Sequence, residues 1–398
     1  MKRRDFLRTT GVSATTLAAG SPFILTNRPW SSDIVRVGVI GTGSRGSGLI
    51  RTMGRIPTLK VTAGCDILPF RLEEALQHAD NATAYQDYRA LLDDEEVDAV
   101  IVATPLYLHS QMANEALDAG KHVYCEKTMA YNAEQTIGLV SAANQHDSQV
   151  FQVGHQYHFS RLYQRVVKII QGEHIGKVTA FECQWNRNGD WRRPVPEPKY
   201  ERTINWRMYR EYSLGLLAEL SSHQIDIVNW ITQAHPLRVI GTGGIDYWQD
   251  GRETLDNVHV IFDYPDGIKA KFTCTTANAY DGYQIKVMGD KATIIVKPNE
   301  AWIYPEEKKS QETGWVDGVS GATKSTLEKY GAIPINVEHT EPTQQALEDF
   351  AESVLHQKPP ISDVYTGAET SFAVQMALQS ILEQRTIDWQ DRFTSSLN

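Results

Sequence analysis

Residues 35–50 read VRVGVIGTGSRGSGLI, and this stretch decides the fold. A short run rich in β-branched residues enters a G-x-G-x-x-G pattern, and an apolar helical pattern follows at once. In a βαβ unit, these glycines permit a tight turn, a close approach to a pyrophosphate and close helix–strand packing. The helix N-terminus then presents oriented N–H groups to the anion. The predicted cofactor contacts in this stretch are Gly41, Gly43, Ser44, Arg45 and Gly46.

A second predicted strand, LKVTAGCD, ends in Asp66, twenty residues after Gly46. An acid at this position accepts hydrogen bonds from the ribose hydroxyls and repels a 2′-phosphate. The sequence therefore favours NAD over NADP as the cofactor. Arg71 is close enough in sequence to keep NADP as the alternative.

Strands and helices continue to alternate up to about residue 153. Residues 98–105, DAVIVATP, form a nearly continuous apolar run that is typical of a buried parallel strand. A predicted helix, a strand and a further helix follow, so we expect a doubly wound parallel sheet. Ligands of such sheets bind beyond the carboxyl ends of the strands. The predicted cofactor contacts at these ends are Thr104, Pro105, His109, Glu126 and Lys127.

After residue 153 the pattern changes to one helix followed by strands grouped together. Two hairpins are indicated by turn residues at Asp266-Gly267 and at Gly289-Asp290. Residues 305–334 lack periodicity and indicate a surface excursion, and two helices are expected near 342–356 and 363–384. We predict a nucleotide-binding domain over residues 34–153 and an α+β domain over residues 154–398.

The segments GVIGTGSRG, VDAVIVATPLYLH and AGKHVYCEK, with a later E-x-x-x-H helix, make the chain after residue 33 similar to the glucose–fructose oxidoreductase, inositol dehydrogenase and MocA family. The resemblance implies an NAD(P)-dependent oxidoreductase that acts on CH–OH groups of sugars. It also implies a Rossmann domain and a second domain with an open, mainly antiparallel sheet, through which subunits form a homodimer or homotetramer. In the family, the strand-end lysine reaches the nicotinamide and is followed by proline; this chain has Lys127 followed by Thr128.

The helix LGLLAELSSHQIDIVNW, residues 214–230, places Glu219, His223 and Asp226 on one predicted helical face. The resemblance implies that His223 lies over the nicotinamide, as in the family's Asp-x-x-x-His pattern, with Glu219 in place of the aspartate. An imidazole pKa near 6.5 suits a general base. Lys127 would then stabilise the developing alkoxide, and Glu219 or Asp226 would orient the imidazole. A metal site here is disfavoured, because no HExxH pattern or cysteine ligand is present.

Two further segments offer substrate contacts. Residues 155–158, HQYH, follow the last predicted strand of the first domain, and residues 185–194, WNRNGDWRRP, combine aromatic rings with forked donors, a pairing that suits sugars. A hinge at the first segment and arginines paired with the acidic surface at the second are the alternatives. The predicted substrate contacts are Tyr157, His158, Trp191, Arg192, Trp206 and Asp226.

Residues 1–33 begin MKRRDFLR and continue into a mildly apolar stretch, a layout that resembles a twin-arginine export signal. This leader has a net charge of +3, and the remaining residues have a net charge of −13. An acidic body argues against nucleic-acid binding. No window approaches the ~18 apolar residues of a membrane span. We expect the twin-arginine machinery to export the protein to the periplasm; a frayed basic terminus is the alternative.

Export affects the predicted chemistry, because a periplasm offers no dependable supply of NAD. The cofactor would have to be tightly bound before export and restored in every cycle. We therefore predict an exported oxidoreductase that oxidises a secondary hydroxyl, with C3 preferred, of a sugar or glycoside. One alternative is a redox-neutral, NAD-dependent glycoside hydrolase acting by transient C3 oxidation and elimination. A second alternative is a sugar-binding module without catalysis.

Overall fold

The computed structural model describes residues 33–306, 315–316, 319–320 and 331–397. Nearly all of the predicted export leader lies outside the described residues, as does most of the predicted surface excursion. Residues 34–398 form one compact unit, so the boundary at residues 153 and 154 remains a prediction.

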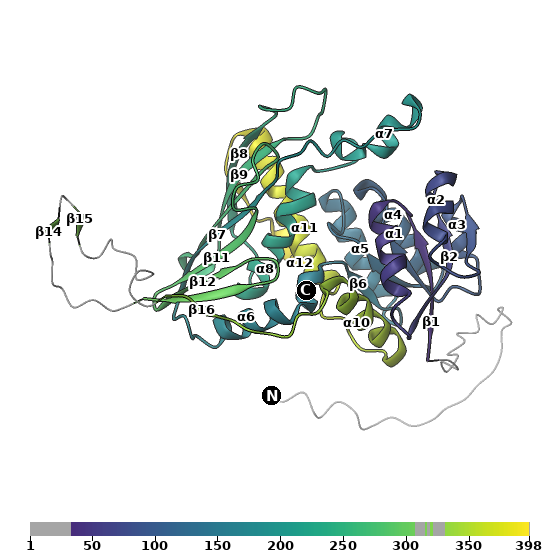
Figure 1. Cartoon of the computed structure of the whole chain (residues 1–398), viewed down its shortest axis with the longest axis horizontal. Helices are drawn as coiled ribbons and strands as arrows, with labels where there is room; N and C mark the ends of the chain where they lie inside the picture. Colours follow the sequence, from purple (N-terminus) through teal and green to yellow (C-terminus); the bar gives the residue numbers. More distant parts are fainter. Residues whose placement is uncertain (1–32, 307–314, 317–318, 321–330, 398) are drawn as a thin grey trace, which may run out of the picture. The chain divides into compact units, whose positions relative to one another are not determined.

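A six-stranded parallel sheet with helices around it forms the first half of this unit (Figure 1). Its strand order is β3-β2-β1-β4-β5-β6. The predicted doubly wound sheet is confirmed. Its strands are β1 (Val35–Ile40), β2 (Leu59–Cys65), β3 (Thr83–Tyr85), β4 (Ala99–Val102), β5 (His122–Cys125) and β6 (Phe151–Val153). Its helices are α1 (Ser44–Met53), α2 (Pro69–Leu76), α3 (Tyr88–Leu92), α4 (His109–Asp118) and α5 (Ala133–Gln145).

The direction of winding reverses between β1 and β4, and the crevice at such a point is where these sheets bind ligands. Gly41 leaves β1 with φ +91°, and a Cβ there would lie 2.7 Å from the carbonyl oxygen of Ala103. A Cβ on Gly46 would clash with the carbonyl oxygen of Gly41. Only glycine at both positions lets α1 begin this close to the strand ends.

The second half contains a nine-stranded sheet in the order β16-β13-β12-β11-β7-β10-β9-β8-β17. Its strands pair antiparallel except for β7 and β10, which run parallel, so the predicted open sheet is mixed but mainly antiparallel. Both predicted hairpins are present, as β9–β10 and β11–β12. The strands are β7 (Val178–Asn186), β8 (Arg238–Gly244), β9 (Asn257–Asp263), β10 (Lys269–Thr275), β11 (Tyr283–Gly289), β12 (Ala292–Val296), β13 (Ala301–Pro305), β16 (Ile333–Pro334) and β17 (Ile387–Asp388). A separate pair is formed by β14 (Trp315–Val316) and β15 (Val319–Ser320).

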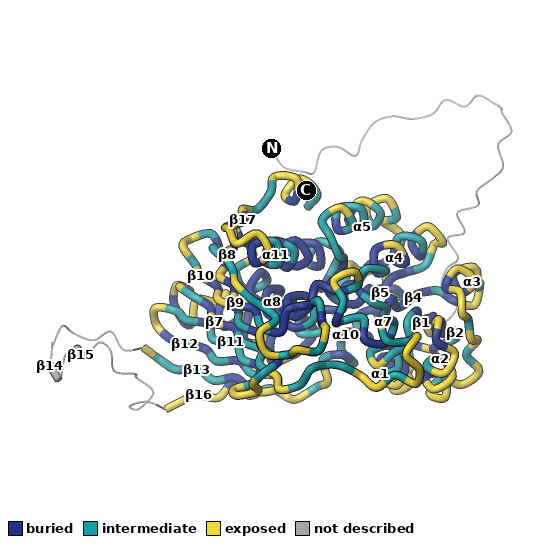
Figure 2. The backbone as a smooth tube through the Cα atoms, turned by 90° about the horizontal axis from the view of Figure 1, so that it is seen from above, coloured by how far each residue is buried: buried dark blue, intermediate teal, exposed yellow. Residues whose placement is uncertain are grey.

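Helices cover one face of this sheet and connect it to the first half. Buried and exposed residues alternate along β9 and β10, as in a sheet with one face packed on the core. The central helix α8 is almost entirely buried, and α11 is buried over most of its length (Figure 2) and packs against β8, α8 and α5. The helices of this half are α6 (Arg161–Gln171), α7 (Glu201–Ile204), α8 (Ser222–Thr232), α10 (Pro342–His356), α11 (Val364–Glu383) and α12 (Asp391–Leu397). A π-helical segment, η5 (Leu217–Ser221), precedes α8.

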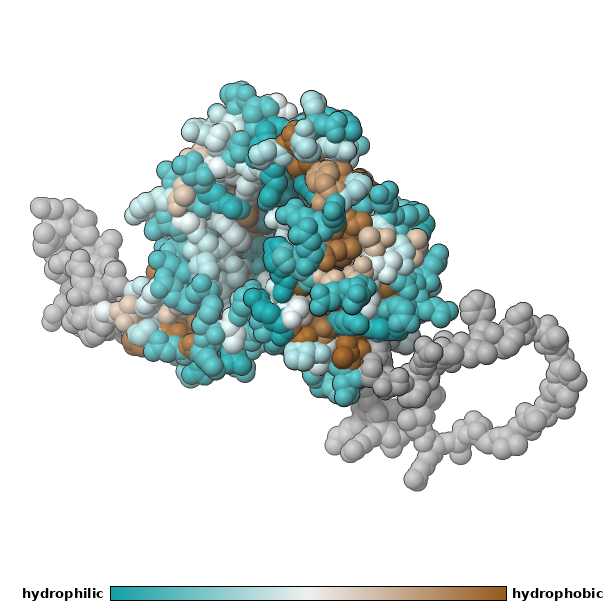
Figure 3. Space-filling view, turned by 45° about the vertical axis from the view of Figure 1, so that its right-hand side comes forward, coloured by the Kyte–Doolittle hydropathy of each residue, from teal (hydrophilic) through white to brown (hydrophobic). Residues whose placement is uncertain are grey.

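Hydrophilic residues cover much of the face shown in Figure 3, with hydrophobic residues gathered in smaller patches. Among the helices of the described residues, none has the length and hydropathy needed to cross a bilayer.

The glycine-to-carbonyl contact gives a matched pair of substitutions in α1. Gly46→Ala forces its Cβ into the carbonyl oxygen of Gly41 and should lower the free energy of unfolding by about 2 kcal/mol or more. Gly48→Ala meets nothing within 4 Å and should raise it by about 0.5–1 kcal/mol, because alanine is the better helix former. Urea unfolding followed by circular dichroism measures both; equal stabilities would contradict this packing.

Candidate active site

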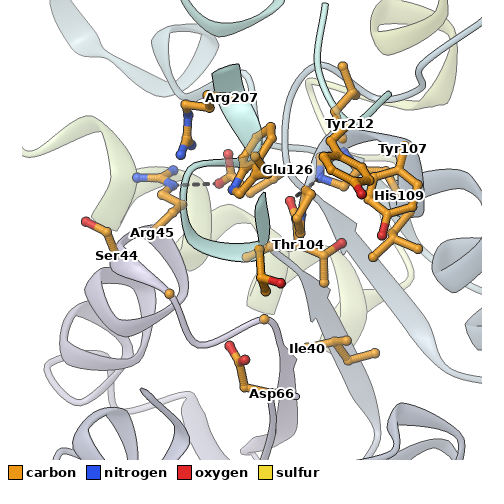
Figure 4. Close-up of a pocket in the computed structure, with 18 of the residues that line it drawn as sticks. Ile40, Ser44, Arg45, Asp66, Thr104, Tyr107, His109, Glu126, Arg207 and Tyr212 are labelled. Carbon is orange, nitrogen blue, oxygen red and sulfur yellow. Dashed lines mark hydrogen bonds and ion pairs between the residues drawn. The ribbon is translucent and has the colours of Figure 1, made fainter. Parts of the chain in front are cut away.

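A cavity of about 520 Å³ lies between the carboxyl ends of the parallel strands and the segment from Arg193 to His223 (Figure 4). It contains most of the residues that the sequence singles out, although the two halves of the unit contribute them from positions far apart in the chain. These are Gly41, Gly43, Ser44, Arg45, Asp66, Thr104, Pro105, His109, Glu126, Lys127, Trp206, Glu219 and His223. Gly46 lies beneath the loop, in the packing of α1.

The glycine loop and Asp66 form the end of the cavity that fits a dinucleotide. One Asp66 oxygen accepts a hydrogen bond from the Thr42 backbone N–H at 2.8 Å and the other from the Leu68 N–H at 2.9 Å, which fixes the carboxylate at the end of β2. Gly43 precedes α1, whose N-terminus has no side-chain cap among the described residues. A Cβ on Gly43 would project into the cavity and meet only Arg71 Nη1, at 3.5 Å. Free N–H groups and an open backbone surface are what a pyrophosphate requires.

Arg45 and Glu126 form an ion pair across the floor of the cavity. Arg45 Nε donates to Glu126 Oε1 at 2.7 Å, and Glu126 is buried at the end of β5 (Figure 4). Of the other guanidinium nitrogens, Nη1 donates to the Thr343 hydroxyl at 3.3 Å, and Nη2 is buried without a hydrogen-bond partner among the described residues.

His109 connects the ends of two strands. Its Nδ1 lies 2.9 Å from the carbonyl oxygen of Thr128, and its Nε2 lies 2.9 Å from that of Thr104. The segment that carries Lys127 is thereby held beside the end of β4. His109 lines the cavity, but both ring nitrogens face the protein backbone.

Lys127 joins the two halves of the site. Its Nζ donates to the carbonyl oxygens of Ala218 at 3.3 Å and Glu219 at 3.1 Å, and the Thr128 hydroxyl donates to Ala218 at 3.1 Å. The Lys127–Thr128 peptide bond is cis. Burial lowers the pKa of Lys127, an effect that the nearby Glu219 and Glu126 carboxylates oppose.

Glu219 is paired with an arginine rather than with His223. Arg207 Nε donates to Glu219 Oε2 at 2.6 Å. Burial alone would raise the pKa of Glu219, but the charges of Arg207 and Lys127 outweigh it and hold that pKa below its usual range. Glu219 is therefore a fixed negative charge beside Lys127.

His223 projects from the start of α8 into the cavity. Its Nδ1 is buried without a hydrogen-bond partner among the described residues, so Nε2 is the nitrogen available on the cavity side. Burial, reinforced by the charge of Lys127, lowers the pKa of His223 well below its usual range. The imidazole is therefore neutral at physiological pH and able to accept a proton.

Five predicted substrate contacts do not line this cavity. His158 and Asp226 form a buried pair, with Nε2 and Oδ1 3.0 Å apart, so Asp226 contacts His158 instead of orienting His223. Tyr157 stacks on Tyr163. Trp191 lies under the guanidinium of Arg187, and Arg192 pairs with Glu201.

The cavity also contains residues that are not among the contacts predicted from the sequence, although Arg71 was considered for NADP and Arg193 belongs to the arginine-rich segment considered for sugar binding. Arg71, on α2, is one of them, and burial lowers its pKa while Asp66 opposes that shift. The segment that contains α7 crosses to the first half, where Tyr212 packs against Tyr107 with ring centroids 5.0 Å apart. The many arginine and aromatic residues of this segment are the sequence feature that indicates a role in the cavity. The added residues include Arg71, Tyr107, Arg193, Arg202, Arg207 and Tyr212.

Nowhere in the described part of the chain do three or more His, Cys, Asp or Glu side chains gather in a way that could hold a metal ion.

Comparison with known proteins supports a dinucleotide site. The family described as "Oxidoreductase family, NAD-binding Rossmann fold" matches residues 35–155, and the "GFO/IDH/MocA C-terminal domain" matches residues 163–295. Together these two segments cover more than half of the chain.

The individual proteins that resemble this chain share about a third of its residues or fewer over the matched segments. Inositol 2-dehydrogenase/D-chiro-inositol 3-dehydrogenase of Lactiplantibacillus plantarum is 30% identical over 50% of this chain and 52% of its own. 2,7-Anhydro-N-acetylneuraminate hydratase of Mediterraneibacter gnavus is 32% identical over 65% of this chain and 66% of its own. The chain spans about half the length of several such curated relatives. A solved structure of scyllo-inositol dehydrogenase from Lactobacillus casei, with bound NAD(H) and scyllo-inositol, shares the fold with a TM-score of 0.69 and 18% identity over 89% of this chain and 99% of its own.

The open surface of Gly43 gives a direct test of the cofactor site. Gly43→Ala should leave thermal stability within about 1 °C of the parent, because its Cβ meets no backbone. It should weaken NAD binding by about tenfold or more, equivalent to about 1.4 kcal/mol, since the methyl group occupies the space of the pyrophosphate. Gly138→Ala, on α5 with nothing within 4 Å, is the matched control. Calorimetric titration with NAD measures the effect, and unchanged affinity in Gly43→Ala would place the dinucleotide elsewhere.

Proposed function

Because the chain belongs to the GFO/IDH/MocA oxidoreductase family, we propose that it is an NAD-dependent enzyme that oxidises a secondary hydroxyl, with C3 preferred, of a sugar or glycoside. The observation that carries the proposal is the meeting of Lys127 and His223 in one cavity with the glycine loop and Asp66. NAD is expected on the glycine loop, with Asp66 at the ribose, and when bound it accepts a hydride from the carbinol carbon.

His223 and Lys127 have different roles at the substrate hydroxyl. His223 Nε2 accepts the hydroxyl proton, because its lowered pKa keeps the imidazole neutral. The Lys127 ammonium, held by two carbonyl oxygens, stabilises the negative charge that develops on the substrate oxygen. Glu219, fixed by Arg207, keeps a counter-charge beside the ammonium and so favours its protonated form.

The substrate class follows from the lining and from the relatives. Trp206 gives a flat face on which sugar C–H groups can stack, and Arg207 packs over that ring at 4.2 Å. Relatives named for inositols and for an anhydro sugar support a polyhydroxylated substrate. Further subunits are expected to join through the open sheet, where Ile240 and Ile261 are exposed.

A redox-neutral reaction is the second candidate, favoured by the relatives named as hydratases. Oxidation at C3 makes the neighbouring C–H acidic, so the aglycone can be eliminated, water can add and the ketone can be reduced again. The same two residues serve both reactions, because His223 accepts the hydroxyl proton in the first step and returns it in the last.

One assay separates these functions. Purified protein is incubated with myo-inositol, scyllo-inositol and 4-nitrophenyl glycosides, with and without an added electron acceptor. Keto sugar that accumulates only with the acceptor supports the oxidoreductase, whereas nitrophenol released without keto sugar supports the redox-neutral hydrolase. Neither product across the panel would favour a binding module.

Lys127→Ala and His223→Ala should each reduce turnover by at least about 100-fold while bound dinucleotide persists, because both act on the substrate hydroxyl and the glycine loop and Asp66 still hold the dinucleotide. Lys168→Ala, on the exposed surface of α6, is the control and should retain full activity. Dinucleotide released by denaturation is measured in parallel. Full turnover in either cavity variant would remove that residue from the mechanism.

We also propose that the leader directs export and that the cofactor is loaded first and retained. Replacing Arg3 and Arg4 together by lysine should keep the protein in the cytoplasmic fraction, while Arg8→Lys should leave export unchanged. Cell fractionation with immunoblotting measures the distribution. A periplasmic fraction that is unaffected by the double replacement would contradict the twin-arginine route.

A further inference from the structure

Residues 193–212, which we call the cover segment, leave the second half of the unit and cross to the first. The helix α7 belongs to this segment, and in two perpendicular views it lies beside the first half and away from the nine-stranded sheet (Figure 1, Figure 2). Arg193, Trp206 and Tyr212 line the cavity from this side. The cover segment therefore faces the strand ends across the space in which the dinucleotide is expected.

Two aromatic pairs join the cover segment to the first half. Tyr200 meets Phe70, on α2, edge to face, with ring centroids 5.7 Å apart. Tyr212 packs against Tyr107, in the turn η1 (Leu106–Leu108), with ring centroids 5.0 Å apart (Figure 4). The helix α2 follows β2 and the turn η1 follows β4, so each pair lies just beyond a strand that ends at the cavity.

A hydrogen bond adds a third contact. The hydroxyl of Tyr131, which follows β5, donates to the carbonyl oxygen of Arg210. The three contacts thus fall on the connections after β2, β4 and β5, strands that are followed closely by Asp66, Thr104 and Glu126. The dinucleotide is expected at these same strand ends. Contacts placed around the site in this way close the cover segment over its ligand.

The cover segment is also held together internally. The buried Asn205 side chain accepts a hydrogen bond from the Arg193 N–H at 2.7 Å and donates to the Arg193 carbonyl oxygen at 3.0 Å. It donates as well to a carboxylate oxygen of Glu201, at 2.9 Å. These bonds close the chain between Arg193 and Asn205 into a loop, so the position of Arg193 at the cavity is fixed by the segment itself.

Two arginines that line the cavity have no side-chain partner. The guanidinium groups of Arg71, on α2, and Arg193, on the cover segment, make no ion pair or hydrogen bond within the described residues. A Cβ on Gly43 would lie 3.5 Å from Arg71 Nη1, so Arg71 lies at the loop surface that the pyrophosphate is expected to meet. Burial lowers the pKa of Arg71, and Asp66 opposes that shift. The positive charges of Arg193 and Arg207 lower it further, so a bound anion would relieve their repulsion.

We propose that the cover segment is the outer wall of the dinucleotide site, in which Arg71 and Arg193 bind the pyrophosphate and the two aromatic pairs hold the wall closed. This inference rests on the proposed dinucleotide site. Guanidinium groups suit this role, because their N–H donors can bond two phosphate oxygens at once. The ligand lies between the cover segment and the strand ends, so the aromatic contacts slow its release.

The rate of NADH release tests the aromatic pairs. Protein loaded with NADH is mixed with a large excess of NAD, and the fall in nicotinamide fluorescence gives the dissociation rate. Tyr200→Ala and Tyr212→Ala should each raise this rate at least about fivefold, because each variant loses one ring pair. Tyr212→Phe keeps the ring and should stay within about twofold of the parent. Tyr280→Ala, which removes a ring that is 78% exposed and lies outside the cavity lining, is the second control.

Calorimetric titration with NAD, NADP and ADP-ribose tests the two arginines. Arg71→Ala and Arg193→Ala should each weaken the binding of NAD and ADP-ribose by about tenfold or more, because both ligands carry the pyrophosphate. Arg165→Ala, an exposed arginine on α6, is the matched control. Weaker binding of NADP alone would place the arginines at a 2′-phosphate and overturn the assignment.

None of these measurements needs a substrate, so they separate this inference from the proposed oxidation. Circular dichroism confirms that each variant is folded. If the parent oxidises sugar while the alanine variants of the cover segment bind NAD and release NADH as the parent does, the outer wall is overturned and the oxidation stands. If the variants behave as expected while the parent oxidises no sugar, the oxidation fails and the outer wall stands.

Discussion

The contact of the Lys127 ammonium with the carbonyl oxygens of Ala218 and Glu219 is the interaction on which the site depends. It joins the end of a parallel strand to the π-helical segment before α8, and the hydroxyls of Thr128 and Ser222 bond to the same Ala218 oxygen. The hydrogen bonds of a π-helical turn run from residue i to i+5, and here the Ala218 and Glu219 carbonyl oxygens also accept donors from the end of the parallel strand. Through this junction, a strand-end lysine and a helix histidine share one cavity.

The nucleotide half could be predicted closely because its signals are local. Gly46 is required by a contact with the backbone of Gly41, five residues away, and the positive φ of Gly41 is a property of the turn itself. Asp66 ends a strand whose neighbour is fixed by the parallel order. The contacts made by the helix that carries His223 were harder to predict. Spacing of four residues places Glu219 beside His223 only if the helix is regular between them, whereas Asp226 and His223 both lie in the regular helix α8. The π-helical segment before α8 alters how Glu219 is turned relative to His223, and tertiary packing brings His158 to Asp226.

Charge is distributed unevenly between the surface and the cavity. Outside the leader the chain has a net charge of −13, yet the cavity is lined by Arg45, Arg71, Lys127, Arg193, Arg202 and Arg207 against three carboxylates. A cationic cavity in an acidic protein suits a dinucleotide, whose pyrophosphate is negative. The segment carrying Arg193 and Arg207 also packs onto the first half through Tyr212 and Tyr107, which favours the retention that export would require.

In the proposed reaction, a carbinol hydrogen moves to a dinucleotide held in this cavity while Lys127 and His223 act on the hydroxyl. The most direct measurement is a single turnover of a sugar deuterated at the reacting carbon, without added electron acceptor, followed by denaturation and mass spectrometry of the released dinucleotide. The dinucleotide from the parent protein should gain the mass of one deuterium, and that from Lys127→Ala or His223→Ala should gain none. Product formation without deuterium in the dinucleotide would contradict the proposed reaction.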